Sequence, residues 1–145
     1  MADTSFAVGF HFSVHFGFDR GDEDIRFQSV SGLGVEYTTE TIVEGGENRF
    51  EHVLPVRTQY SNLVLNRALV TNSALVTWCE EAFRDRIFQP IDVTIHLLNP
   101  DGEPLRTWQV DRAWPMKWSF SDFNAEENSL VIETLELAYR TFHHN

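Results

Sequence analysis

The N-terminal part of the chain alternates strictly between large apolar residues and small or polar ones. Every even position from Phe6 to Phe18 is Phe or Val, and the odd positions between them are Ala7, Gly9, His11, Ser13, His15 and Gly17. A period of two is typical of a β-strand with one buried face. At ~3.3 Å per residue such a strand spans roughly 43 Å, which is about the diameter of a compact domain of this length. The pattern therefore predicts a strand that crosses the whole molecule.

Two further segments have the pattern of long strands. Residues Leu33–Val43 alternate between apolar or threonine positions and an outer face that carries Glu36 and Glu40, and Leu130–Phe142 closes the chain. A short strand is expected over residues 25–30, followed by a bend over residues 31–34.

The region between these long segments contains turn signals and shorter strands. Residues 44–48 form a connection whose paired glycines permit positive φ. Pro55 is expected to separate a strand over Arg49–Leu54 from another over Tyr60–Arg67, because proline disfavours a central strand position.

One stretch has the period of a helix. Its apolar stripe consists of Leu75, Trp78, Cys79, Ala82, Phe83 and Ile87. Thr71, Asn72 or Ser73 can cap its start, and Gln89-Pro90 is expected to end it.

The segment after the predicted helix indicates a hairpin. Ile91–Leu98 and Leu105–Val110 flank the turn sequence Asn99-Pro100-Asp101-Gly102. Residues Trp114–Trp118 are expected to form an edge or kinked strand. The whole pattern predicts a mainly β fold, a sandwich or barrel with one flanking α-helix.

Composition narrows the class of protein. The chain has 145 residues, of which 42% are hydrophobic. This length and this share of hydrophobic residues predict a single domain over residues 1–145. A net charge of −11 argues against binding to nucleic acid or to an anionic membrane. No apolar run reaches the ~18–20 residues that cross a bilayer, the first residues lack the basic start of a secretory signal, and Cys79 is the single cysteine. These features predict a soluble protein made in the cytoplasm.

Candidate catalytic and metal-binding residues are few. His11 and His15 lie on one strand face, but they are about 13 Å apart along the strand, so each would need a partner from another strand or subunit to hold a metal. The acidic turn over residues 19–24 lacks the spacing of a calcium loop, and His143-His144 are expected to be a frayed end. Cys79 lies on the apolar stripe of the helix, and no catalytic motif is present. The sequence thus predicts no catalytic residue, no cofactor site and no metal site, and no enzyme.

A binding module is the alternative. Trp108, Trp114 and Trp118 either form a platform for a carbohydrate or peptide or pack beneath the helix. The first arrangement predicts a monomeric β-sandwich that recognises its ligand through these tryptophans.

Six stretches in order across the chain carry a more specific resemblance. They are Phe27–Leu33, Glu44–Asn48, Leu54-Pro55 with Tyr60–Leu65, Leu97–Asn99 with Gly102–Pro104, Ala113–Trp118, and Glu133–Ala138. From about Phe6 to Phe142 the chain resembles the tail-tube protein family of contractile phages and phage-like contractile injection systems. Two positions depart from the pattern of many family members, at Val56 and at Asn66-Arg67-Ala68.

The resemblance implies both a fold and an assembly. The fold would be a sandwich or barrel with a flanking helix, related to the secreted ring protein of type VI secretion. Six copies would form a ring whose inner sheets join into one barrel around a lumen, and the rings would stack into a tube inside a contractile sheath. Neighbouring tube paralogues, hub or spike, baseplate and sheath proteins would be the partners, within a tail or injection particle. A tube-initiating ring is as compatible with the resemblance as the main tube, and a tube initiator or a second type of tube protein is slightly favoured.

The long strands fit such an assembly on physical grounds, because open strand edges are normally blunted in monomers and a closed ring removes them. We expect Phe6–Phe18, Leu33–Val43 and Leu130–Phe142 to supply the pore barrel. The residues expected to face the lumen are Ser13, His15, Glu36, Thr38 and Glu40. The residues expected to contact another subunit or ring are Glu44, Gly45, Gly46, Glu47 and Asn48.

Overall fold

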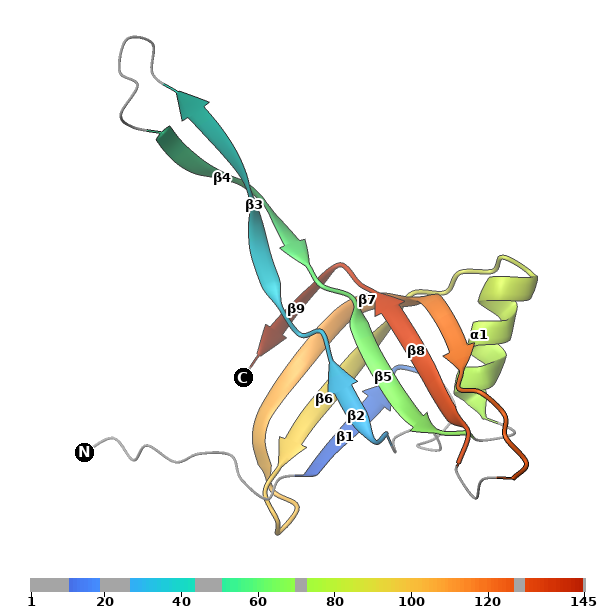
Figure 1. Ribbon diagram of the computed structural model, residues 1–145. Coiled ribbons are helices and arrows are strands. Elements are labelled where there is room, and N and C mark those ends of the chain that lie inside the picture. The colour runs from blue at the N-terminus through green and yellow to red at the C-terminus, as the bar shows by residue number, and fades with distance from the viewer. Residues whose placement is uncertain (1–10, 19–26, 44–50, 70–72, 127–129, 145) are drawn as a thin grey trace.

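The computed structural model describes residues 11–18, 27–43, 51–69, 73–126 and 130–144. These ranges contain nine strands and one helix, α1 (Ala74–Arg84), and they confirm the mainly β fold (Figure 1). The strands are β1 (His11–Phe16), β2 (Ser29–Ser31), β3 (Val35–Val43), β4 (Glu51–Tyr60), β5 (Leu63–Ala68), β6 (Ile91–Leu98), β7 (Pro104–Phe120), β8 (Ile132–Ala138) and β9 (Thr141–His144).

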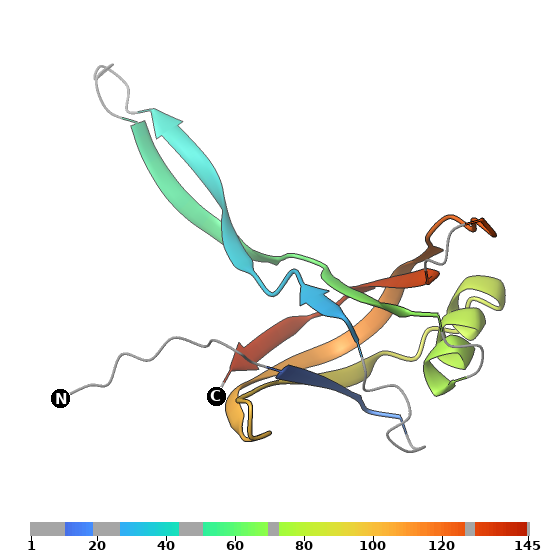
Figure 2. The ribbon, with the colours of Figure 1, turned by 60° about the horizontal axis from the view of Figure 1, so that its bottom comes forward.

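Seven strands form one strongly curved antiparallel sheet, which we call the body together with α1. Its order is β1-β6-β7-β8-β5-β2, and β9 pairs with β7 on the edge away from β6, the edge that β8 also uses. The core lies on the concave side, and α1 covers one end of it (Figures 1 and 2). Strands β3 and β4 form a separate two-stranded sheet, which we call the hairpin.

Strand β1 confirms the alternation predicted for the N-terminal segment. Phe12, Val14 and Phe16 belong to the core or pack against it. Residues 6–10 of the predicted strand lie outside the described residues. Strand β1 pairs antiparallel with β6, from His11 opposite Leu98 to Phe16 opposite Val93.

The predicted hairpin after the helix is confirmed, but its second strand is much longer than expected. Asn99 Oδ1 accepts hydrogen bonds from the backbone N–H of Asp101 and Glu103, and Gly102 has φ 83° in the turn. The separate strands predicted over Leu105–Val110 and Trp114–Trp118 are wrong, because β7 is continuous. Its pairing with β6 shifts register at Asp111 and Arg112, where Arg112 adopts φ 55°, and we call this irregularity the kink of β7.

The predicted C-terminal strand is interrupted. Strands β8 and β9 both pair antiparallel with β7, Ala138 opposite Trp114 and Thr141 opposite Asp111. The break at residues 139–140 lies opposite the kink of β7, and the Arg140 N–H still donates to the carbonyl of Asp111 at 2.9 Å. The segment therefore follows one neighbour throughout, as a single long strand would.

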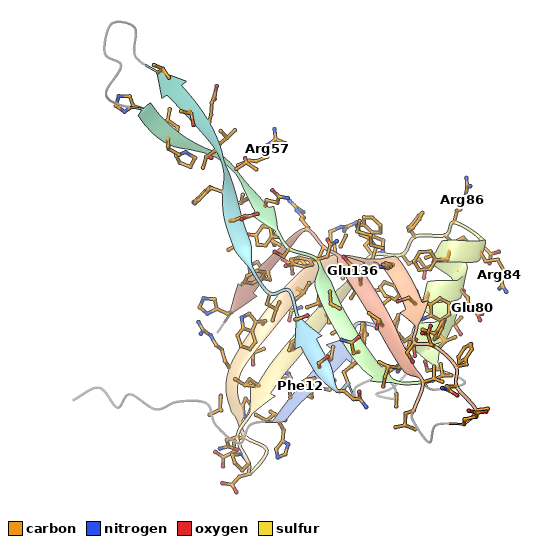
Figure 3. The ribbon with its side chains drawn as sticks, in the orientation of Figure 1. Phe12, Arg57, Glu80, Arg84, Arg86 and Glu136 are labelled. Carbon is orange, nitrogen blue, oxygen red and sulfur yellow. The ribbon has the colours of Figure 1, made fainter. Side chains whose placement is uncertain are left out.

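Helix α1 is shorter than the apolar stripe predicted. Ser73 caps it, since its Oγ accepts from the Val76 N–H at 3.2 Å. The helix ends at Arg84 and not at Gln89-Pro90, because Arg86 turns into the left-handed region with φ 55°. Phe83 and Ile87 are consequently 45% and 48% exposed, whereas the other members of the stripe are buried. Glu80 and Arg84 point away from the body (Figure 3).

Pro55 does not separate two strands. It lies within β4, whose partner is β3 alone, so the missing N–H interrupts no central ladder. The pairing shifts register beside it, between Thr38 and Thr39. The real break comes at Ser61 and Asn62, before β5. The short strand expected over residues 25–30 is β2, which starts at Ser29, and residues 25–26 lie outside the described residues.

Candidate assembly interface

The hairpin projects away from the body (Figures 1 and 2). Many of its apolar side chains are exposed to solvent. An isolated two-stranded hairpin is at best marginally stable in water, and a large exposed apolar surface marks a site of interaction. The exposed large apolar residues of the hairpin are Val35, Tyr37, Ile42, Val43, Val53, Leu54 and Val56.

One face of the hairpin continues the apolar face of the body. The register places Val35 opposite Tyr60 and Thr41 opposite Val53, and directly opposed residues point to the same side. At the base of the hairpin, the ring of Tyr60 lies 5.8 Å from that of Tyr139 and 5.3 Å from that of Phe142. The apolar face is covered there and exposed beyond it.

The opposite face of the hairpin carries the predicted lumen residues Glu36, Thr38 and Glu40. Thr38 lies opposite Arg57, and its Oγ1 accepts from the Arg57 N–H at 3.3 Å. Arg57 points away from the ribbon (Figure 3). The structure thus brings these three predicted residues together on one face, which also carries Ile42 and Leu54 toward the tip of the hairpin.

Ser13 and His15 lie on a different polar surface, the side of the body sheet that faces away from the core. Hydrogen bonds cross the strands there, from Thr94 Oγ1 to Gln109 Oε1 at 2.8 Å and between His96 Nδ1 and Thr107 Oγ1 at 2.9 Å. The structure therefore divides the predicted lumen residues between the body and the hairpin. The predicted contact residues Glu44 to Asn48 lie outside the described residues.

The C-terminal histidines belong to the same sheet and are not a frayed end. Both are part of β9, and His143 Nε2 lies 2.9 Å from Asp111 Oδ2. Thr141 Oγ1 also donates to Asp111 Oδ2, at 3.0 Å. These contacts hold the last strand to β7.

The body sheet ends in two open edges. Strands β1 and β2 stand at the two ends of the strand order, so within the described ranges each is paired on one side only. A cavity of about 330 Å³ lies between these ends, with Phe12, Leu97 and Trp108 on one side and Val30 and Leu33 on the other. An open edge next to an apolar groove is a surface that monomeric proteins normally avoid.

The tryptophans form no common platform. Trp118 stacks on Phe83 of α1 with ring centres 6.5 Å apart, and Trp114 packs against Phe88 at 5.9 Å. Trp108 lies in the groove instead, with the Arg106 guanidinium 5.6 Å from its ring. The prediction that these tryptophans pack beneath the helix is therefore confirmed for Trp118 and wrong for Trp108.

A buried polar network, which the sequence analysis missed, fixes α1 on the body. Arg67 Nε lies 3.0 Å from Glu133 Oε2, and the two residues are 3% and 2% exposed. Arg67 Nη2 donates to the capping Oγ of Ser73 at 3.2 Å, and Trp118 Nε1 donates to Glu133 Oε1 at 2.8 Å. The alternation of the sequence could have indicated that Glu133 is buried, because Glu133 lies on the same strand face as the buried Leu135 and Leu137.

Among the residues that the structure describes, no group of three or more histidine, cysteine, aspartate or glutamate side chains could hold a metal ion. In the same ranges, no helix is long and apolar enough to span a membrane.

Comparison with known proteins decides the family. Residues 8–143 match the family described as T4-like virus tail tube protein gp19. The chain belongs to this tail-tube family. Its function is accordingly structural, as a component of tail tubes or injection-system tubes, and it is not an enzyme. No curated protein sequence matches the chain.

Solved structures support the same assignment for this tail-tube protein. A chain in the cryo-EM structure of the anti-feeding prophage baseplate is 30% identical, with TM-score 0.85 over 100% of this chain and 97% of that one. A chain in the sheath-tube complex of the extracellular contractile injection system PVC, in its extended state, is 28% identical, with TM-score 0.78 over 99% of both chains. Hcp1 from Flavobacterium johnsoniae is 14% identical with TM-score 0.55 over 92% and 94%, and shares the fold.

Proposed function

We propose that this tail-tube protein forms hexameric rings that stack into the tube of a contractile injection particle, with the apolar face of each hairpin covered by a neighbouring copy. The observation that carries the proposal is the hairpin itself. Its apolar face continues that of the body, yet Val35, Tyr37 and Val53 are more than half exposed in the single chain. A second copy would bury this surface and supply the hydrophobic stabilisation that the hairpin lacks.

The open edges of the body favour a closed ring. Strands β1 and β2 each offer backbone N–H and C=O groups on one side, and joining the sheets of neighbouring copies would satisfy them. The whole chain, residues 1–145, acts as one domain in this arrangement.

The two polar surfaces line the lumen in this proposal. Ser13 and His15 would contribute from the body, and Glu36, Thr38 and Glu40 from the hairpin. Residues Glu44 to Asn48, which follow β3 in the sequence, would contact the next subunit or ring. A Gly45→Pro/Gly46→Pro variant tests this contact, and tubes of normal appearance by electron microscopy would contradict it.

The partners follow from the same role. Baseplate, hub or spike, sheath and other tube proteins would contact the ring in a particle assembled from subunits made in the cytoplasm. The chain is similar both to a chain of a baseplate structure and to a chain of a sheath-tube complex, so a ring that initiates the tube and the main tube are both compatible with the role.

The hairpin can be tested by charging either of its faces. Size-exclusion chromatography with light scattering and negative-stain imaging report the assembly state of the wild-type chain and two variants. Tyr37→Lys/Val53→Lys places two positive charges on the apolar face, and the matched control His52→Lys/Gln59→Lys adds two to the polar face of β4.

We expect wild type and control to form rings with a central hole, and the apolar-face variant to stay at the monomer mass of 16.8 kDa at concentrations at least tenfold higher. Rings formed equally well by the Tyr37→Lys/Val53→Lys variant would contradict the role of the hairpin. A wild-type chain that remains monomeric at high concentration would contradict the ring.

A further inference from the structure

The polar surface of the body brings together two histidines that are far apart in the sequence. His15 of β1 and His96 of β6 have ring centres 5.6 Å apart and ring planes at 74°. The register explains their proximity, because His96 is directly opposite Ser13 and His15 is the next residue of β1 on the same face. His15 thereby gains the cross-strand partner that His11 cannot provide.

Their separation suits two ligands of one metal ion. Zinc–nitrogen bonds of ~2.0–2.1 Å place each imidazole centre roughly 3.2 Å from the metal, so two ligands at a tetrahedral angle have centres about 5.3 Å apart. The observed distance of 5.6 Å between the ring centres is close to this value, and the broad χ2 wells of histidine allow each ring to turn a nitrogen toward a shared ion.

His96 also has the outer contact that metal-binding histidines typically make. Its Nδ1 lies 2.9 Å from Thr107 Oγ1 of β7, the strand on its other side. A hydroxyl that accepts from Nδ1–H holds the ring in the tautomer whose Nε2 carries a lone pair for a metal.

We propose that His15 and His96 form a two-histidine site for a divalent first-row transition metal, with water in the remaining positions. Imidazole ligands favour Cu²⁺, Ni²⁺ and Zn²⁺ and disfavour Mg²⁺ and Ca²⁺. The affinity for Ni²⁺ exceeds that for Zn²⁺ only where the site allows the coordination geometry that Ni²⁺ prefers. Since the described residues supply no third ligand, the site has open positions and binds reversibly. The proposal concerns the single chain and does not depend on ring formation.

Isothermal titration calorimetry with NiCl₂ and ZnCl₂ at pH 7.5 tests the site. The variants are His15→Gln, His96→Gln and Thr107→Val, and the matched control is His143→Gln, a histidine of the same sheet whose partner is Asp111. We expect the wild type to bind one ion, each ligand variant to lose at least tenfold in affinity, and Thr107→Val to lose about tenfold through the freed ring. Circular dichroism confirms that each variant is folded.

One further measurement separates this site from unspecific binding. MgCl₂ at the same concentration should give no heat. Equal affinity of wild type, His15→Gln and His96→Gln would overturn the proposal, as would a loss confined to His143→Gln.

Discussion

The body and the hairpin are built from the same alternating pattern but differ in what covers their apolar residues. In the body, Val14, Val93 and Val110 are fully buried, because the curved sheet and α1 enclose them. In the hairpin, Val53 and Val35 alternate just as regularly and remain exposed, since within the described ranges β3 and β4 pair only with each other. The pattern shows which face of a strand is to be buried, but not whether the same chain buries it.

The buried ion pair of the body is the place where a single change should cost most. Glu133→Leu leaves the Arg67 guanidinium buried without its carboxylate partner, so we expect the free energy of unfolding to fall by about 3–5 kcal/mol. Urea denaturation measures the change. The double variant Arg67→Met/Glu133→Leu removes both charges and should recover most of the loss. Equal stability of the two variants would contradict this role of the pair.

The junction between body and hairpin depends on Gly32. This residue has φ 94°, and a Cβ there would lie 1.9 Å from the carbonyl oxygen of Asn62, which connects β4 to β5. We expect Gly32→Ala to lower the free energy of unfolding by about 3 kcal/mol. The control is Gly34→Ala, whose Cβ would meet Ser61 Oγ at an ordinary 3.6 Å. Unfolding curves that move equally for both would show that the junction tolerates a side chain.

One chemical change made in both regions compares them directly. Val93 is 0% exposed and Val53 is 62% exposed. Val93→Ala should cost about 2 kcal/mol through lost burial and a cavity, and Val53→Ala should stay within about 0.5 kcal/mol in the monomer. Thermal unfolding at a concentration where the chain is monomeric provides both values. A similar loss at both positions would mean that the hairpin is covered within its own chain.

The smallest effect concerns the contact between the base of the hairpin and the body. Burial, together with the neighbouring Tyr60, raises the pKa of the Tyr139 phenol. The folded state then keeps the phenol proton at a pH where the unfolded state loses it. The contribution of Tyr139 to the free energy of unfolding is therefore fully present below pH ~10 and declines as the pH rises above that value. Tyr139→Phe should flatten this alkaline loss of stability, measured by urea unfolding at pH 8 and pH 10.5. An unchanged slope would contradict it.

Much of the fold could be predicted from local pattern. The alternation of the first segment, the capping by Ser73 and the turn at Asn99–Gly102 depend on residues close in sequence, and the structure confirms them for the described residues. Six matching stretches were enough to identify the family.

What the sequence did not reveal depends on contacts between distant residues. Helix α1 ends before Arg86, and β7 runs through Arg112 with a shift in register; both arginines adopt φ 55°, which the residue type does not signal. The ion pair of Arg67 with Glu133 and the contact of His15 with His96 each join different strands, so neither can be read from spacing along one segment.

Strand β7 has a mechanical consequence. Its first half is hydrogen-bonded to β6 and β9 and its second half to β8, so one unbroken backbone connects these three strands of the body. A force applied along this strand would load many interstrand hydrogen bonds in shear at the same time and could not break them one by one. The body should therefore yield as a unit or not at all when a tube built from it is pushed against a resisting wall.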